Sequence, residues 1–100
     1  MNNSILDAIS ATENGIVSKK LVSGNGGNIS LFAFDTGQSL DKHSTPHKAF
    51  ILAIEGEASF QKGSETILLK KDDLIILQES EEHSVEAKTS FKMLLVIIKP

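Results

Sequence analysis

Apolar residues in this chain recur in short runs, and glycine, asparagine, serine or charged residues separate the runs. Runs of about four to eight residues between such turn formers are typical of the strands of a sandwich or barrel. From Gly15 onward the pattern therefore predicts an all-β fold. The predicted strands are Ile16–Ser23, Ile29–Asp35, Ala49–Glu55, Ala58–Gln61, Glu65–Leu69, Leu74–Leu77, Ser84–Ala87 and Phe91–Ile98.

The start of the chain has a different pattern. Ser4 is a suitable N-cap for one or two helical turns, and Ile5, Leu6 and Ile9 would share one face of them. A helix this short is marginal unless it docks onto the rest of the protein. We therefore expect residues 1–14 to form a short helical or irregular segment and residues 15–100 to form a single barrel domain.

Two of the predicted strands are apolar at consecutive positions, namely Phe50–Ile54 and Met93–Ile98. A strand with one face in water alternates apolar and polar residues, so these two strands are expected to be covered on both faces. A second subunit would provide that cover, and we expect a homodimer. The alternative is a monomer in which the N-terminal segment folds over the same face.

The overall composition excludes several classes of function. The 100 residues include ten basic and thirteen acidic residues, and no stripe of Lys or Arg predicts nucleic-acid binding. Cysteine is absent, which excludes disulfides, thiolate catalysis and Cys-type zinc sites. The N-terminus does not resemble a signal peptide and the longest apolar run is too short to span a membrane, so the expected location is cytoplasmic.

The histidines are the main candidates for chemistry. His43 and His47 lie four residues apart, and Pro46 argues against a helix between them. If the segment is extended, both imidazoles lie on one face, and His83 joins them only if the barrel brings its strand alongside. Three imidazoles around a metal with open positions would make a site of the catalytic type. From spacing alone, histidines on the surface or in loops are the favoured interpretation, because neither the pair nor the triple is a specific motif.

The segment Gly37–Gly56 resembles the first motif of the cupins, with its two end glycines and His43 in register. The segment that ends at His83 is similar to the second cupin motif, whose histidine matches His83. The resemblance covers Ile16–Lys99 and is closest to the small single-domain cupins. It implies a double-stranded β-helix, the cupin jelly-roll barrel, with a ligand or metal site inside the barrel.

The chain departs from the first motif at two positions. The second histidine of the motif falls on Thr45, and the motif glutamate falls on Ala49. His47, two residues after Thr45, would keep the same facing in an extended segment and is the expected replacement. We therefore predict that a divalent transition metal (zinc, iron, manganese or nickel) is bound by three ligands, His43, His47 and His83.

Other polar residues near the predicted barrel are candidates for ligand binding. Thr45 lies beside the histidines, and Gln61 and Gln78 would donate hydrogen bonds if they pointed into the barrel. The alternative is that both glutamines face solvent. The acidic stretch Glu79–Glu82 precedes His83 and predicts a solvated loop, with an inward carboxylate as the alternative.

Three hypotheses for function follow. The first is a cupin that binds a divalent metal and a small polar ligand in a histidine-lined site, with its reaction undetermined. The second is a metal-free module that binds or senses a small ligand. The third is a protein whose site is vestigial and which works through its dimer surface. Fold analogy does not choose among them, because one barrel hosts many functions.

Overall fold

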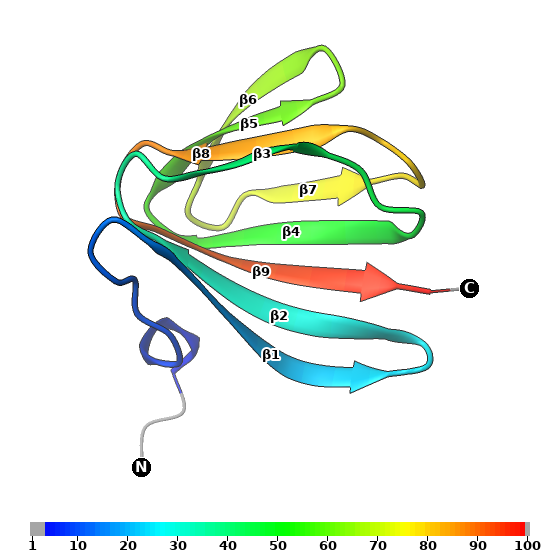
Figure 1. Cartoon of the computed structure of the whole chain (residues 1–100), viewed down its shortest axis with the longest axis horizontal. Helices are drawn as coiled ribbons and strands as arrows, with labels where there is room; N and C mark the ends of the chain where they lie inside the picture. The colour runs from blue at the N-terminus through cyan, green and yellow to red at the C-terminus, as the bar shows by residue number, and fades with distance from the viewer. Residues whose placement is uncertain (1–3, 100) are drawn as a thin grey trace.

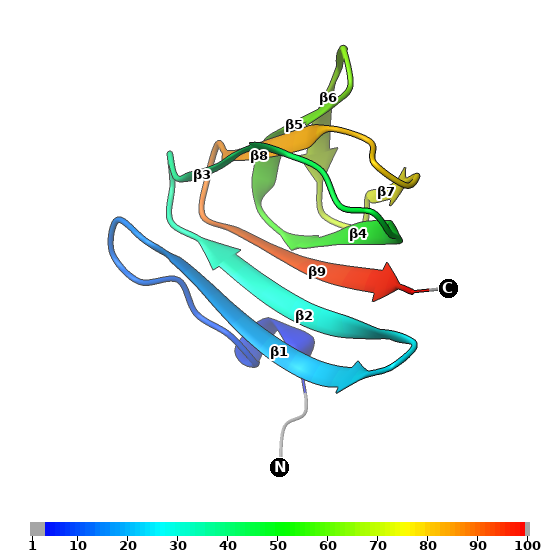
Figure 2. The same cartoon turned by 45° about the vertical axis from the view of Figure 1, so that its right-hand side comes forward.

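The strands form two antiparallel sheets that face each other in the computed structural model, which describes residues 4–99 (Figures 1 and 2). In chain order the described strands are β1 (Ile16–Gly24), β2 (Gly27–Phe34), β3 (Ser39–His43), β4 (Lys48–Glu55), β5 (Glu57–Lys62), β6 (Glu65–Lys70), β7 (Leu74–Leu77), β8 (His83–Ala87) and β9 (Phe91–Ile98). No helix of these residues is long and apolar enough to cross a membrane.

The order of the strands is that of a double-stranded β-helix. The five-stranded sheet has the order β1-β2-β9-β4-β7, and the four-stranded sheet has the order β3-β8-β5-β6. Strands that are distant in sequence lie side by side: β9, the last strand, is paired with both β2 and β4 (Figure 1). The predicted all-β jelly-roll fold is confirmed.

All eight predicted strands are present, two of them, β7 and β9, with the predicted bounds. The prediction missed β3, which lies at the edge of its sheet and pairs with β8. Four of the five residues of β3 are exposed. A strand with one partly buried position has no alternating pattern of apolar and polar residues, so the sequence carried no signal for it.

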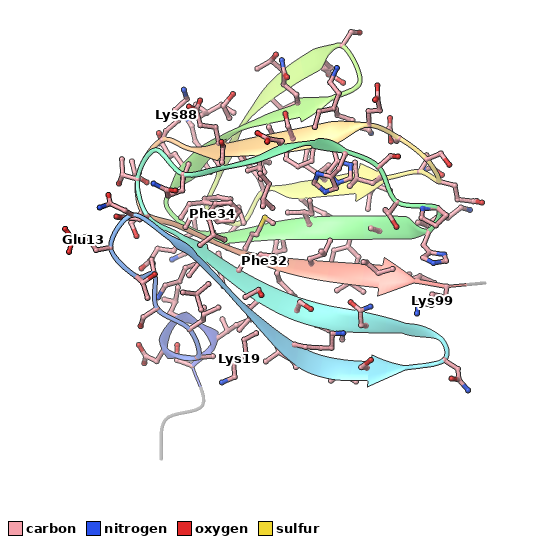
Figure 3. The ribbon with its side chains drawn as sticks, in the orientation of Figure 1. Glu13, Lys19, Phe32, Phe34, Lys88 and Lys99 are labelled. Carbon is pink, nitrogen blue, oxygen red and sulfur yellow. The ribbon has the colours of Figure 1, made fainter. Side chains whose placement is uncertain are left out.

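The core lies between the two sheets and is built from alternate residues of the strands. Phe34, Phe60 and Phe91 are fully buried there. Figure 3 shows Phe34 and its neighbour Phe32 on β2, and Phe32 packs against the same core. These phenylalanines therefore serve to pack the core.

The N-terminal segment begins with one turn of 3-10 helix, η1 (Ile5–Asp7). The side chain of Ser4 accepts a hydrogen bond from the backbone N–H of Leu6, so the predicted N-cap is confirmed. Ile9 is buried, but Ile5 is 40% exposed, so the two do not share a buried face. The expected one or two helical turns are thus a single turn followed by irregular chain.

This segment packs under the five-stranded sheet, on the face away from the core (Figure 2). Ile9 packs there against Leu31, Ala33 and Ile54. The ammonium group of Lys92 donates to the carbonyl of Leu6 at 2.6 Å and holds the segment in place. The chain therefore covers one end of the outer face of this sheet by itself.

The rest of the outer face of the five-stranded sheet remains apolar and accessible. Strand register aligns one residue from each strand into a row across this face. The row consists of Val22, Ile29, Val96, Phe50 and Ile76. Val22 is 59% exposed and Ile76 is 48% exposed. We call these five residues the apolar row.

Candidate functional site

Pairing of β3 with β8 brings two of the three histidines together. His43 and His83 are direct cross-strand partners, and their ring centroids lie 4.2 Å apart at an interplanar angle of 62°. Such cross-strand pairs are the closest side-chain neighbours in an antiparallel sheet. The histidines that match the two family motifs are therefore in contact, although 40 positions separate them in the chain.

Each of these rings is held by a backbone carbonyl of its own strand segment. The Nδ1 of His43 lies 2.7 Å from the carbonyl oxygen of Asp41, and the Nδ1 of His83 lies 3.0 Å from that of Glu81. A carbonyl oxygen only accepts hydrogen bonds, so both Nδ1 atoms carry a proton. In the neutral ring the Nε2 atom is then an unprotonated acceptor.

The histidine pair lines a small cavity of about 60 Å³ between the sheets. The other lining residues are all apolar: Phe32, Leu40, Ile51, Phe60, Val85, Met93 and Leu95. The ring of Phe60 lies nearly parallel to that of His83, with centroids 5.9 Å apart and an angle of 11°. The polar character of this cavity therefore comes from the two imidazoles.

Burial makes His83 a weak base. His83 is 7% exposed, and this burial lowers its pKa below the ordinary value of 6.5, because a charged ring would lose its hydration. The hydrogen bond to the carbonyl of Glu81 opposes the shift, and the neighbouring His43 adds to it. At neutral pH and above, the His83 ring is therefore neutral and its Nε2 accepts hydrogen bonds.

His47 lies elsewhere. It lines a separate surface pocket of about 210 Å³, together with Pro46, Lys48, Glu79 and Ile98. The prediction assumed an extended chain from His43 to His47, but β3 ends at His43 and β4 begins at Lys48. The alternation of facing is lost in the intervening loop, so His47 does not replace the histidine that is missing at position 45.

The three polar residues predicted to bind ligand do not line the histidine cavity. Thr45 lies in the loop after β3, where its hydroxyl group accepts from the backbone N–H of His47 at 3.5 Å. Gln61 is exposed, and its side chain accepts from the hydroxyl group of Ser84 at 3.4 Å. Gln78 is exposed after the end of β7. Gln61 and Gln78 therefore have the solvent-facing placement that the sequence left open, and the inward orientation needed for ligand binding in the barrel is not found.

Comparison with known proteins places this geometry in a family. The model of the cupin domain family matches residues 30–98, which includes both strands of the histidine pair. The chain is a cupin. No match is found among the curated proteins.

Several solved structures are similar to this cupin. A cupin superfamily protein from Desulfitobacterium hafniense is 27% identical and has a TM-score of 0.92, over 96% of this chain and 88% of that protein. A conserved protein of unknown function from Streptococcus pyogenes is 27% identical with a TM-score of 0.86, over 100% and 90% of the two chains. A cupin 2 conserved barrel domain protein from Leptotrichia buccalis is 32% identical with a TM-score of 0.89, over 95% of this chain and 46% of that one.

The residues of this cupin do not fit a metal centre with three protein ligands. Among residues 4–99, no group of three or more His, Asp or Glu side chains is placed to hold a metal ion. The position of the motif glutamate is Ala49, which is 4% exposed in the core. Glu81 is engaged elsewhere, because its carboxylate accepts from the backbone N–H of Gln78 at 3.0 Å and lies 4.0 Å from the Lys62 ammonium. The expected ligand set is thus reduced to a pair.

The walls of the cavity were largely missed at the sequence level. Leu40, Met93 and Leu95, which line the cavity, were not singled out for the site. Leu95 and Met93 lie on the strand that is apolar at consecutive positions, so alternation there does not show which residues face the core. Their role depends on which face of β9 meets the four-stranded sheet.

Proposed function

We propose that this cupin is a metal-free module that binds a small molecule through the cavity between its sheets. The observation that supports this proposal is the isolated pair of His43 and His83 in an otherwise apolar cavity. Apolar walls with a few convergent polar groups are the usual composition of a small-molecule site. The walls provide contact area, and the two imidazoles orient the ligand.

The proposal is tested in two steps on protein purified without a metal-affinity tag. Elemental analysis after incubation with zinc, iron, manganese and nickel is expected to find less than about a tenth of an equivalent of each, since structural sites need a complete ligand set. A panel of small polar fragments is then added, and the ring signals of the histidines are followed by NMR. At least one fragment is expected to shift the signals of His43 and His83.

His47→Ala is the matched control, because His47 lies outside the cavity, and it is expected to leave the fragment response unchanged. Stoichiometric metal that is lost in His43→Ala would contradict the proposal and favour the metal-dependent alternative. A panel in which no fragment shifts either ring signal would contradict it as well.

We also propose that two copies of the chain associate through the apolar row. Within the described residues, the N-terminal segment covers only the end of this sheet that contacts Ile9. Monomeric proteins rarely leave a large contiguous apolar patch in water, and a two-fold axis through this sheet would bury the row against itself. In this proposal the N-terminal segment covers one end of the outer face, and the second copy of the chain covers the apolar row on the rest of it.

Ile76→Lys is expected to turn a dimer into a monomer, because it places a charge within the buried row. Light scattering coupled to size-exclusion chromatography measures the mass, which is expected to be twice that of one chain for the unchanged protein. Leu68→Lys is the matched control, since Leu68 is 49% exposed on the other sheet, close to the 48% of Ile76. A monomeric unchanged protein, or a dimeric Ile76→Lys variant, would contradict the proposal.

A further inference from the structure

The histidine cavity presents hydrogen-bond acceptors and no donors. Both Nδ1 protons are already donated to the carbonyls of Asp41 and Glu81, so the neutral rings have only the lone pairs of their Nε2 atoms left to offer. The seven other lining residues are apolar and add neither a donor nor a positive charge. A ligand must therefore bring its own donors to this cavity.

A carboxylate is poorly suited to the same cavity. Its oxygens would face the lone pairs of two imidazoles, and an anion among the apolar lining residues loses hydration without gaining a partner. Protonating His83 would supply a donor, but burial lowers the pKa of His83 and opposes this. An amide or amine nitrogen avoids the conflict, because its N–H groups point at the two acceptors.

We propose that the His43–His83 cavity selects ligands that end in a primary amide or primary amine over ligands that end in a carboxylate. This selectivity rests on the proposed function, since it concerns the same site. The donor group has at least two N–H bonds, one for each Nε2 atom. The two rings are in contact, with centroids 4.2 Å apart, so a single nitrogen that donates one N–H to each Nε2 atom would bridge both.

The size of the cavity limits what enters it. A volume of about 60 Å³ is well below the roughly 300–1,000 Å³ of pockets that enclose a drug-sized ligand. The cavity therefore receives the end of a ligand rather than a whole molecule. For this reason the test uses short probes that differ only in their end group.

The test measures the binding of butyramide, butylamine and butyrate by NMR titration at pH 8, which is above the lowered pKa of His83. Butyramide and butylamine are expected to bind about tenfold more tightly than butyrate, which is the size of effect for one buried hydrogen bond made or lost. Comparing the amide with the amine separates a neutral donor from a cationic one. Two-bond ¹H–¹⁵N correlation spectra of the histidine rings are expected to show unprotonated Nε2 atoms. The ¹⁵N chemical shifts of these atoms are expected to change when a probe binds.

His83→Phe removes one acceptor but keeps a ring of similar size against Phe60, and it is expected to abolish the preference for the amide. His47→Phe is the control and is expected to keep it. Butyrate binding as tightly as butyramide would overturn the selectivity and leave the proposed function standing. If none of the three probes binds, the selectivity is overturned as well. The proposed function is tested separately by the wider fragment panel. A protonated Nε2 in the free protein at pH 8 would overturn it without any ligand.

Discussion

Replacing Phe60 by alanine is expected to lower the free energy of unfolding by about 3–5 kcal/mol, the usual cost of removing a buried aromatic ring. Phe60 is fully buried, and it is the residue whose ring is stacked on His83. Its loss leaves a void beside the histidine pair, so fragment binding is expected to weaken together with stability. Urea denaturation measures the first effect, and NMR titration of the folded variant measures the second.

Leu68→Ala is the control for this change. Leu68 lies on β6, the strand next to β5 that carries Phe60, but its side chain is 49% exposed. Its removal is expected to cost less than about 1 kcal/mol, as for most surface changes. If Phe60→Ala costs no more than Leu68→Ala, the packing described for the cavity is wrong.

Replacing Gly56 by alanine is expected to destabilise the fold by more than about 3 kcal/mol. Gly56 lies between β4 and β5, where the chain passes from one sheet to the other, and its φ angle is +80°. A Cβ atom at this position would overlap the carbonyl oxygen of Ser90 and lie 2.8 Å from Oγ1 of Thr89. Both the backbone conformation and the contact with the turn before β9 therefore require glycine.

Gly63→Ala separates the two causes. Gly63 also has a positive φ angle, +59°, but no atom lies within 4 Å of the position that its Cβ would take. Its cost is expected to be the conformational penalty alone, about 1–2 kcal/mol. Thermal and chemical denaturation of both variants measure the difference. Equal destabilisation by the two substitutions would show that the contact of Gly56 with Ser90 does not matter.

Alternation and turn residues in the sequence were sufficient to predict the fold class and eight of the strands. The physical reason is that a strand with one buried face has an apolar side chain at every second residue, which is a local pattern visible in the sequence. The runs Phe50–Ile54 and Met93–Ile98 likewise indicated strands with two apolar faces. The same local signal failed for β3, because an edge strand with exposed side chains does not alternate.

The candidate site was predictable in part. His43 and His83 were identified from their positions in two motifs, and the structure places them in contact. His47 was predicted as a metal ligand on the assumption that side chains alternate between the two faces of an extended strand through residues 44–47. In the structure these residues form a loop. Side chains alternate in this way only while the backbone stays extended. The placement of His47 therefore depended on where the strand ends, and sequence patterns locate such boundaries poorly.

The sequence by itself thus determined that the chain forms an all-β barrel and that His43 and His83 belong to its candidate site. Only the tertiary structure decided that, among residues 4–99, no third ligand lies beside these two histidines and that their Nδ1 atoms are bonded to carbonyls. It also decided that the N-terminal segment covers one end of the outer sheet face and leaves the apolar row open. Such features depend on contacts between distant segments, and a local pattern of residues does not encode the register or the loop path that creates them.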